Sequence, residues 1–145
     1  MKVRKATKQR KDFRAFNKLC YRTGYSYEVG KKSDERNCDA TIDPPLEYAE
    51  YCREIDNADR EYYMLVDENK VIGIVTVEGN IVEQFVIGRE YQQNGNGRVF
   101  YEVLENILRS KGEKEIILSC YYAGSIAFWE KMGFRKNGQF FIKEM

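Results

Sequence analysis

The alternation of apolar and polar positions divides the chain into segments of two different periods. Short runs rich in apolar and β-branched residues at 62–66, 71–77, 80–87 and 115–119 are typical of β-strands. Segments at 12–19, 45–55, 98–112 and 123–132 carry apolar side chains at a helical spacing. With further strands expected at 2–7 and 139–143, this order predicts an α+β fold, an α/β sandwich-like arrangement around one mixed sheet.

A turn containing two glycines, residues 92–97, separates the strand at 80–87 from the helix at 98–112. The strand is expected to be largely buried, and the helix is expected to end at Gly112. The first N–H groups of a helix lack internal partners and carry partial positive charge. Gly95 and Gly97 would let a bulky anion approach them, which predicts a phosphate cradle. The alternative is an ordinary loop, and neither a nucleoside-triphosphate P-loop nor a complete dinucleotide fingerprint is present.

These residues carry a family resemblance. The pattern Gln92-x-x-Gly95-x-Gly97 after an apolar strand resembles the acetyl-coenzyme A motif of GNAT-superfamily N-acetyltransferases. A second block, Ser125-Ile-Ala-Phe-Trp-Glu-Lys-Met-Gly-Phe134, is similar to the Ala-Ile-x-Phe-Tyr-Glu-Lys-x-Gly-Phe helix of the same family. The two blocks occur in the family's order, and the pair is far more specific than either block alone.

The resemblance implies a GNAT fold, with a mixed and mostly antiparallel central sheet flanked by about four helices. The length of 145 residues predicts a single domain over residues 1–145. It implies an N-acetyltransferase that moves an acetyl group from acetyl-coenzyme A to a primary amine by direct attack in a ternary complex. The amine would belong to a small molecule or a peptide. The implied coenzyme contacts are Phe85, Val86, Ile87, Gln92, Gln93, Asn94, Gly95, Asn96, Gly97, Arg98 and Phe128.

Glu83 is the candidate general base because it is the only acid on the central strand, and several family members have a Glu here. A strict period of two places it on the same face as Ile81, Phe85 and Ile87, in semi-apolar surroundings that would raise its pKa. The alternative is an acid at a strand end that faces solvent or pairs with Lys or Arg.

The chain differs from the family pattern at the residue that would protonate the thiolate released from the coenzyme. Trp129 stands where the family often has a Tyr, and an indole N–H is not a useful acid. Tyr122 stands where the family has a common Asn, so Tyr121 or Tyr122 is the candidate acid, with water as the alternative. The departure leaves a second function open, namely a catalytically weak, regulatory acyl-coenzyme A-binding module.

The amino-acid composition excludes several catalytic mechanisms and kinds of site. The chain has no histidine, which excludes Ser-His-Asp and Cys-His mechanisms and His-based metal sites, and no metal is expected. The four cysteines are widely spaced and are expected to be reduced thiols. With no membrane-spanning apolar run and no signal-peptide pattern, a cytoplasmic protein without a membrane partner is expected.

The amine acceptor is not identified by the sequence. Glu47, Glu50 and Glu54 are either an exposed charged stripe or a negative wall that favours a cationic amine. Tyr25 and Tyr27 lie in a long irregular segment, 21–45. The resemblance implies that this region lines the acceptor site, and the alternative is that both are surface tyrosines. Basic residues near the N-terminus are either a solvated face around a short core helix or a site for a polyanion or the coenzyme 3′-phosphate. The net charge of +1 argues against nucleic acid as a partner. The strand at 139–143 is expected at a sheet edge, where it could pair between subunits in a homodimer.

Overall fold

The computed structural model describes residues 1–20, 45–120 and 123–145. These residues form a seven-stranded sheet in the order β1-β2-β3-β4-β5-β7-β6. Its strands are β1 (Lys2–Lys5), β2 (Glu61–Asp67), β3 (Lys70–Glu78), β4 (Ile81–Ile87), β5 (Glu115–Leu118), β6 (Arg135–Asn137) and β7 (Phe140–Glu144). All neighbouring strands are antiparallel except β4 and β5, which are parallel. The mixed, mostly antiparallel sheet of the predicted fold class is therefore confirmed.

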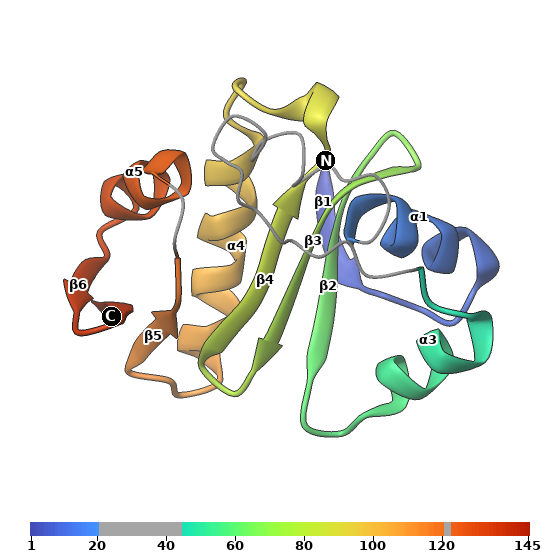
Figure 1. The fold of residues 1–145 in the computed structure, drawn as a ribbon, viewed down its shortest axis with the longest axis horizontal. Coiled ribbons are helices and arrows are strands. Elements are labelled where there is room, and N and C mark those ends of the chain that lie inside the picture. The colour runs from blue at the N-terminus through green and yellow to red at the C-terminus, as the bar shows by residue number, and fades with distance from the viewer. Residues whose placement is uncertain (21–44, 121–122) are drawn as a thin grey trace.

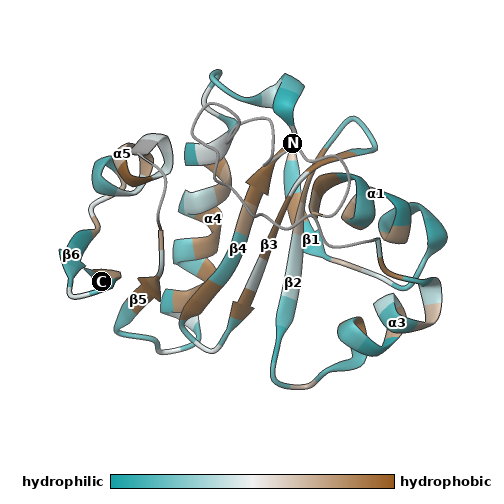
Figure 2. Cartoon of the chain, in the orientation of Figure 1, coloured by the Kyte–Doolittle hydropathy of each residue, from teal (hydrophilic) through white to brown (hydrophobic). Residues whose placement is uncertain are grey.

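Helices cover both faces of this sheet (Figure 1). They are α1 (Arg10–Cys20), α3 (Tyr48–Asp56), α4 (Asn96–Ser110) and α5 (Ala123–Lys131), with a 3-10 turn, η1 (Arg89–Tyr91), before α4. Side chains alternate between two cores along β2: Tyr62 and Met64 pack with α1 and α3, whereas Tyr63 and Leu65 pack in the core of α4 and α5. Apolar residues concentrate on β3, β4 and β5 and on part of α4 (Figure 2).

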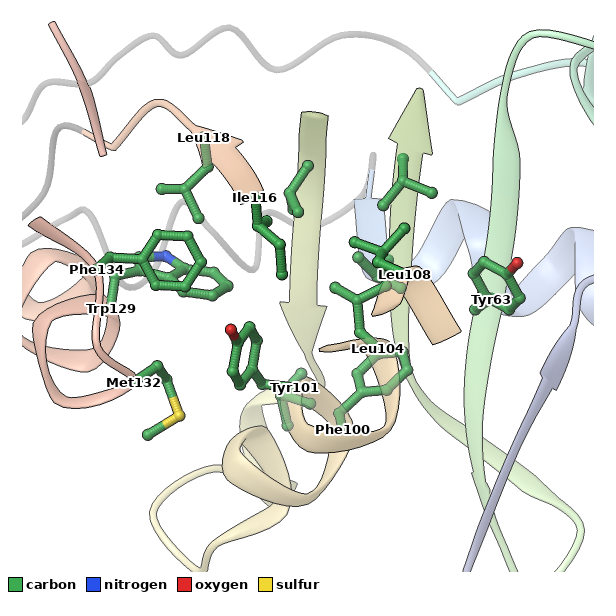
Figure 3. Packing of buried hydrophobic residues seen from close by; sticks show 14 of the residues in the cluster. Tyr63, Phe100, Tyr101, Leu104, Leu108, Ile116, Leu118, Trp129, Met132 and Phe134 are labelled. Atoms are coloured by element: carbon green, nitrogen blue, oxygen red, sulfur yellow. The ribbon is translucent and has the colours of Figure 1, made fainter. Parts of the chain in front are cut away.

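The larger core joins α4 to α5 on one face of the sheet (Figure 3). Phe100, Leu104 and Leu108 of α4 are fully buried, and they recur at the spacing that the sequence predicts for one helix stripe. Trp129 and Phe134 approach Tyr101 from the α5 side, with ring centroids 5.7 Å away in both cases. The core therefore fixes α5 relative to the beginning of α4.

Both of these helices end at a left-handed glycine. Gly112 has φ +90° and Gly133 has φ +102°. After α5, the N–H of Phe134 donates to the carbonyl of Trp129 at 3.0 Å, and the two rings lie 5.2 Å apart. This is the Schellman arrangement with its hydrophobic contact, so the stops expected at Gly112 and Gly133 are confirmed.

The length of the β2–β3 turn and the start of α3 differ from the prediction. The β2–β3 turn has two residues, not four, because Asp67 pairs with Lys70 and the residues between them take positive φ, which matches the sheet twist. Helix α3 begins at Tyr48, not at residue 45, because Glu47 is its N-cap and forms a capping box with Glu50. Because they form this capping box, the two glutamates stabilise the N-terminus of α3.

The expectation of an edge strand at 139–143 is wrong. Strand β7 lies between β5 and β6, and the edge is the three-residue strand β6, which is polar throughout (Figure 2). A left-handed Gly138 lets the chain fold back after β6 and cover β7. The proposed pairing of this strand between subunits therefore loses its structural basis.

Several predictions fall outside the described residues. Tyr25 and Tyr27 belong to 21–44, and Tyr121 and Tyr122 precede α5. In the described parts of the chain, no helix has the length and apolar character needed to cross a bilayer. Cys20 and Cys52 carry free thiols, in agreement with the expectation of reduced cysteines.

Candidate active site

Strands β4 and β5 separate after a short parallel contact. Only Ile81 and Val82 of β4 are in register with β5, opposite Ile117 and Leu118. Beyond Val82, the edge of β4 has no strand partner among the residues that the structure describes. Phe85 and Val86 are half-buried, so the strand is less buried than predicted, and its free edge is the physical reason. An extended ligand can pair there with backbone groups of Phe85 and Val86.

The glycine turn is fixed against the end of β4 by two side-chain amides. Gln92 donates from Nε2 to the carbonyl oxygen of Ile87 at 2.9 Å, and Asn96 donates from Nδ2 to that of Tyr91 at 2.9 Å. Gln93 and Gly95 take positive φ, at +68° and +87°. These hydrogen bonds therefore hold the turn in a defined conformation between the end of β4 and the start of α4.

The N-terminus of α4 has the features of an anion site. Gly95 is the N-cap, no side chain caps the helix, and its first turn holds no acidic residue. Arg98 in that turn is exposed and lies 3.6 Å from Glu102, a loose surface pair. Unpaired N–H groups, the helix dipole and a guanidinium thus favour a phosphate here.

Three elements far apart in sequence meet at this turn. A Cβ atom at Gly97 would lie 3.1 Å from Cε1 of Phe128 on α5. The Phe128 ring centroid lies 5.8 Å from that of Phe85 on β4. The structure thus brings together coenzyme-contact candidates from the strand, the turn and the second motif block.

Glu83 lies at a β-bulge, which corrects the face predicted for it. Val82 pairs with Val77 and Gln84 pairs with Thr76, so Glu83 is the extra residue on β4. The bulge shifts the phase of the strand: Phe85 and Ile87 pack in the α4 core with Val82, whereas Glu83 turns to the opposite face, where it meets Arg60. A strict period of two could not predict this, because it assumes an unbroken ladder.

The surroundings of Glu83 combine apolar and charged neighbours. Its side chain is 29 % exposed, and Arg60 Nε lies 3.0 Å from its Oε1. Burial has the largest influence on the pKa of Glu83 and raises it, Arg60 opposes that rise, and Glu78 and Glu54 add to it, so the pKa stays above its ordinary value. The pKa of Glu83 is therefore raised, as expected for a general base. Glu83 also pairs with an arginine, as the alternative interpretation expected.

Sequence reasoning missed Arg60. It lies between α3 and β2, outside any periodic segment, and nothing in its neighbourhood marks it as a partner of β4. The partnership depends on the antiparallel order β2-β3-β4 and on the bulge, both of which are long-range features.

Trp129 is a core residue in this structure. It is 6 % exposed and makes edge-to-face contacts with Phe85, Tyr101, Phe128 and Phe134. Its indole stabilises the junction of β4, α4 and α5.

Some of the basic N-terminal residues are engaged within the fold. Arg4 pairs with Asp12, Lys8 pairs with Asp56, and the Arg10 guanidinium lies 4.0 Å from the centroid of the Tyr48 ring. Within the described ranges, no group of three or more acidic or cysteine side chains is arranged to hold a metal ion.

Comparison with known families agrees with this geometry. The sequence profile of the acetyltransferase (GNAT) family matches residues 28–134, which is most of the chain. The chain belongs to the GNAT acetyltransferase family. The resemblance carried by the two motif blocks is thereby confirmed, and the matched range includes β4, the glycine turn and α5.

Solved structures of several acetyltransferases share the fold over essentially the whole chain. An acetyltransferase from Thermus thermophilus superposes with a TM-score of 0.73 at 14% identity, covering 100% of this chain and 98% of that one. A phosphinothricin acetyltransferase from Sinorhizobium meliloti, in complex with acetyl-coenzyme A, gives 0.72 at 19% identity, covering 99% and 88%. A ribosomal-protein-alanine N-acetyltransferase from Brucella melitensis gives 0.71 at 16% identity, covering 100% of both chains. Among curated protein sequences, no significant match was found.

Proposed function

We propose that this GNAT protein is an acetyl-coenzyme A-dependent N-acetyltransferase acting on a primary amine of a small molecule or a peptide. The observation that carries the proposal is the convergence of Phe85, Gly97 and Phe128 beside the free edge of β4. We also propose that residues 1–145 form one domain, which the continuous sheet from β1 to β6 supports.

The coenzyme would be held by backbone groups along two connected segments. Phe85, Val86 and Ile87 would align the pantetheine arm along the part of β4 that lies beyond its pairing with β5, and the N–H near Val86 would contact the thioester oxygen. The turn from Gln93 to Arg98 would hold the pyrophosphate at the N-terminus of α4. Gln92 supports the turn through its bond to Ile87 rather than by reaching outward. Acetyl-coenzyme A, when bound, supplies an activated acetyl thioester.

Glu83 would act as the general base, directly or through one water. The amine gives up a proton to the Glu83 carboxylate, and its nitrogen then forms a bond to the acetyl carbonyl carbon. The carbon–sulfur bond breaks, and its electron pair leaves on sulfur, which then takes a proton. A base with a raised pKa suits this step because it is a better proton acceptor near neutral pH. Since Glu83 faces away from α4, the amine would approach from the side of the sheet covered by α1 and α3.

Protonation of the departing thiolate is assigned to Tyr121, Tyr122 or water. Trp129 is excluded from this role by its chemistry, and its aromatic contacts give it a packing function instead. Attraction of a cationic acceptor gains little from the three glutamates of this region, because Glu47 and Glu50 cap α3 and Glu54 is bound by Arg60 and Tyr62.

The test is a thermal melt with acetyl-coenzyme A, followed by an assay of thiol release with a panel of primary amines. A ligand at about a hundred times its dissociation constant adds roughly 2.7 kcal/mol to the free energy of unfolding, which is a shift of several degrees. Acetyl-coenzyme A binding with thiol release for at least one amine supports the enzyme. Binding without release from any amine would support the acyl-coenzyme A-binding regulatory module, and no binding would overturn both functions.

A further inference from the structure

Arg60 joins three carboxylates that come from three different elements. Its Nε lies 3.0 Å from Oε1 of Glu83 on β4 and 3.9 Å from Oε1 of Glu78 on β3. Its Nη1 lies 3.3 Å from Oε1 of Glu54 on α3. One guanidinium thus interacts with three carboxylates, so the cluster of these four side chains has an excess of negative charge.

Two contacts fix the position of the guanidinium, one at the Arg60 backbone and one at its partner Glu54. The Arg60 backbone N–H donates to the carbonyl of Asn57 at 3.3 Å, immediately before β2 begins. Glu54 is held in turn by the hydroxyl of Tyr62, at 2.5 Å. Because the donors of a guanidinium lie in one rigid plane, holding Nη1 at α3 determines where Nε meets Glu83.

We propose that Arg60 is a positioning residue for catalysis, which orients the Glu83 carboxylate at the β4 bulge and keeps it ionised beside Glu78 and Glu54. This inference rests on the proposed function, because it assigns Arg60 a part in the same reaction. Without the guanidinium, Glu83 would lie beside two like charges and would bind a proton more readily. With it, the bulge residue is both basic, through burial and its acidic neighbours, and available as a carboxylate at neutral pH.

The charged groups around Glu83 determine whether a given substitution raises or lowers its pKa. Among the described elements these are Arg60, Glu78 of β3 and Glu54 of α3, with Tyr62 of β2 bound to Glu54. Removing the cation raises the pKa of Glu83, so the activity that depends on its carboxylate is lost at a higher pH. Removing the Glu78 charge has the opposite effect and lowers that pKa.

The decisive measurement is a carboxyl titration by NMR in protein labelled with 13C at the side-chain carboxyl of glutamate. The Glu83 signal is assigned from its loss in Glu83→Gln. We expect its midpoint to rise by roughly half a pH unit or more in Arg60→Gln, to return most of the way in Arg60→Lys, and to fall in Glu78→Gln. Arg109→Gln is the matched control, since it removes an equal charge from an ion pair on α4, and it should leave Glu83 unchanged.

Turnover supplies the second measurement. The acid limb of the pH profile of kcat/KM should move in Arg60→Gln by the same amount and in the same direction as the NMR midpoint. An unmoved Glu83 midpoint in both Arg60→Gln and Glu78→Gln would overturn the proposal, even if the variants are less stable. A moved midpoint with an unmoved acid limb would also overturn it, because Glu83 would then not be the base. Failure of the proposed function is recognised separately, by absent turnover in the unmodified protein.

Discussion

Phe128 on α5 lies directly against Gly97 in the first turn of α4, so that a Cβ atom on Gly97 would come within 3.1 Å of the ring. The space above this turn is therefore limited by an aromatic side chain as well as by the helix backbone. A larger residue at 97 must displace the ring or enter the space in front of the helix N–H groups. A side chain that enters this space blocks the approach of a phosphate to those groups.

We expect Gly97→Leu to abolish the thermal shift produced by acetyl-coenzyme A, while Gly97→Ala retains part of it because a half-buried ring can yield by a few tenths of an ångström. The measurement is a melt at matched ligand concentrations. Ser110→Leu, at the exposed far end of the same helix, is the control and should keep the full shift. A full shift in Gly97→Leu would show that the glycine serves only the local fold.

Asp12 is the buried anchor of the N-terminal strand and α1. It is fully buried, and its carboxylate accepts bonds from Arg4 Nη1 and Nη2 at 2.8 and 2.9 Å and from Thr7 Oγ1 at 2.7 Å. We expect Asp12→Ala to lower the free energy of unfolding by about 2–4 kcal/mol at neutral pH, since it leaves a guanidinium and a hydroxyl without their partner. Urea unfolding measures this directly, with Lys8→Ala as an exposed ion-pair control that should cost little.

The same carboxylate predicts a dependence of stability on pH. Burial alone would raise the pKa of Asp12, but the bonds from Arg4 and Thr7 outweigh it and hold the pKa below its ordinary value of 3.8. A lowered pKa stabilises the folded state above the pKa of the unfolded chain, and this stability is lost as the pH falls through the folded-state pKa. The difference in unfolding free energy between the unmodified protein and Asp12→Asn should therefore shrink below about pH 4. A difference that stays constant into strong acid would contradict the role given to the charge.

The parts of the fold that local sequence determines were predictable. The stops of α4 and α5 at Gly112 and Gly133 follow from left-handed glycines after amphipathic helices, and the contact of Phe134 with Trp129 follows from the second stop. The glycine turn before α4 was predictable for the same reason. Two motif blocks then provided the family, which local patterns alone did not.

The parts that depend on long-range pairing were not predictable. The bulge at Glu83 arises from the register between β3 and β4, so its side chain faces Arg60 and not the α4 core. Strand β6 contains only Arg, Lys and Asn, and its place in the sheet comes from pairing with β7. A polar three-residue strand leaves no hydrophobic period in the sequence.

Trp129 offers a test of whether the protein lacks an acid at the family's usual position. We expect Trp129→Tyr to lower the free energy of unfolding by about 1–3 kcal/mol, because the indole fills a buried aromatic cluster. We expect it to leave kcat no higher than in Trp129→Phe, the matched variant that has the ring without the hydroxyl. A large gain in kcat for Tyr over Phe would instead indicate a protein that has lost its acid, in support of the weak, regulatory module.

The strongest test of the proposed chemistry is Glu83→Gln, because it removes a charge while keeping the shape of the side chain. General-base catalysis contributes about 10²- to 10⁴-fold, so kcat/KM should fall by that order at the pH optimum, and the acid limb of the profile should disappear. The thermal shift with acetyl-coenzyme A should persist, since Phe85 and Ile87 turn to the other side of β4 from Glu83. Glu78→Gln removes a neighbouring carboxylate from the same cluster and should keep most of the activity. If Glu83→Gln and Glu78→Gln lose the same small fraction of activity, the amine reaches the coenzyme deprotonated by solvent, and Glu83 is a structural partner of Arg60.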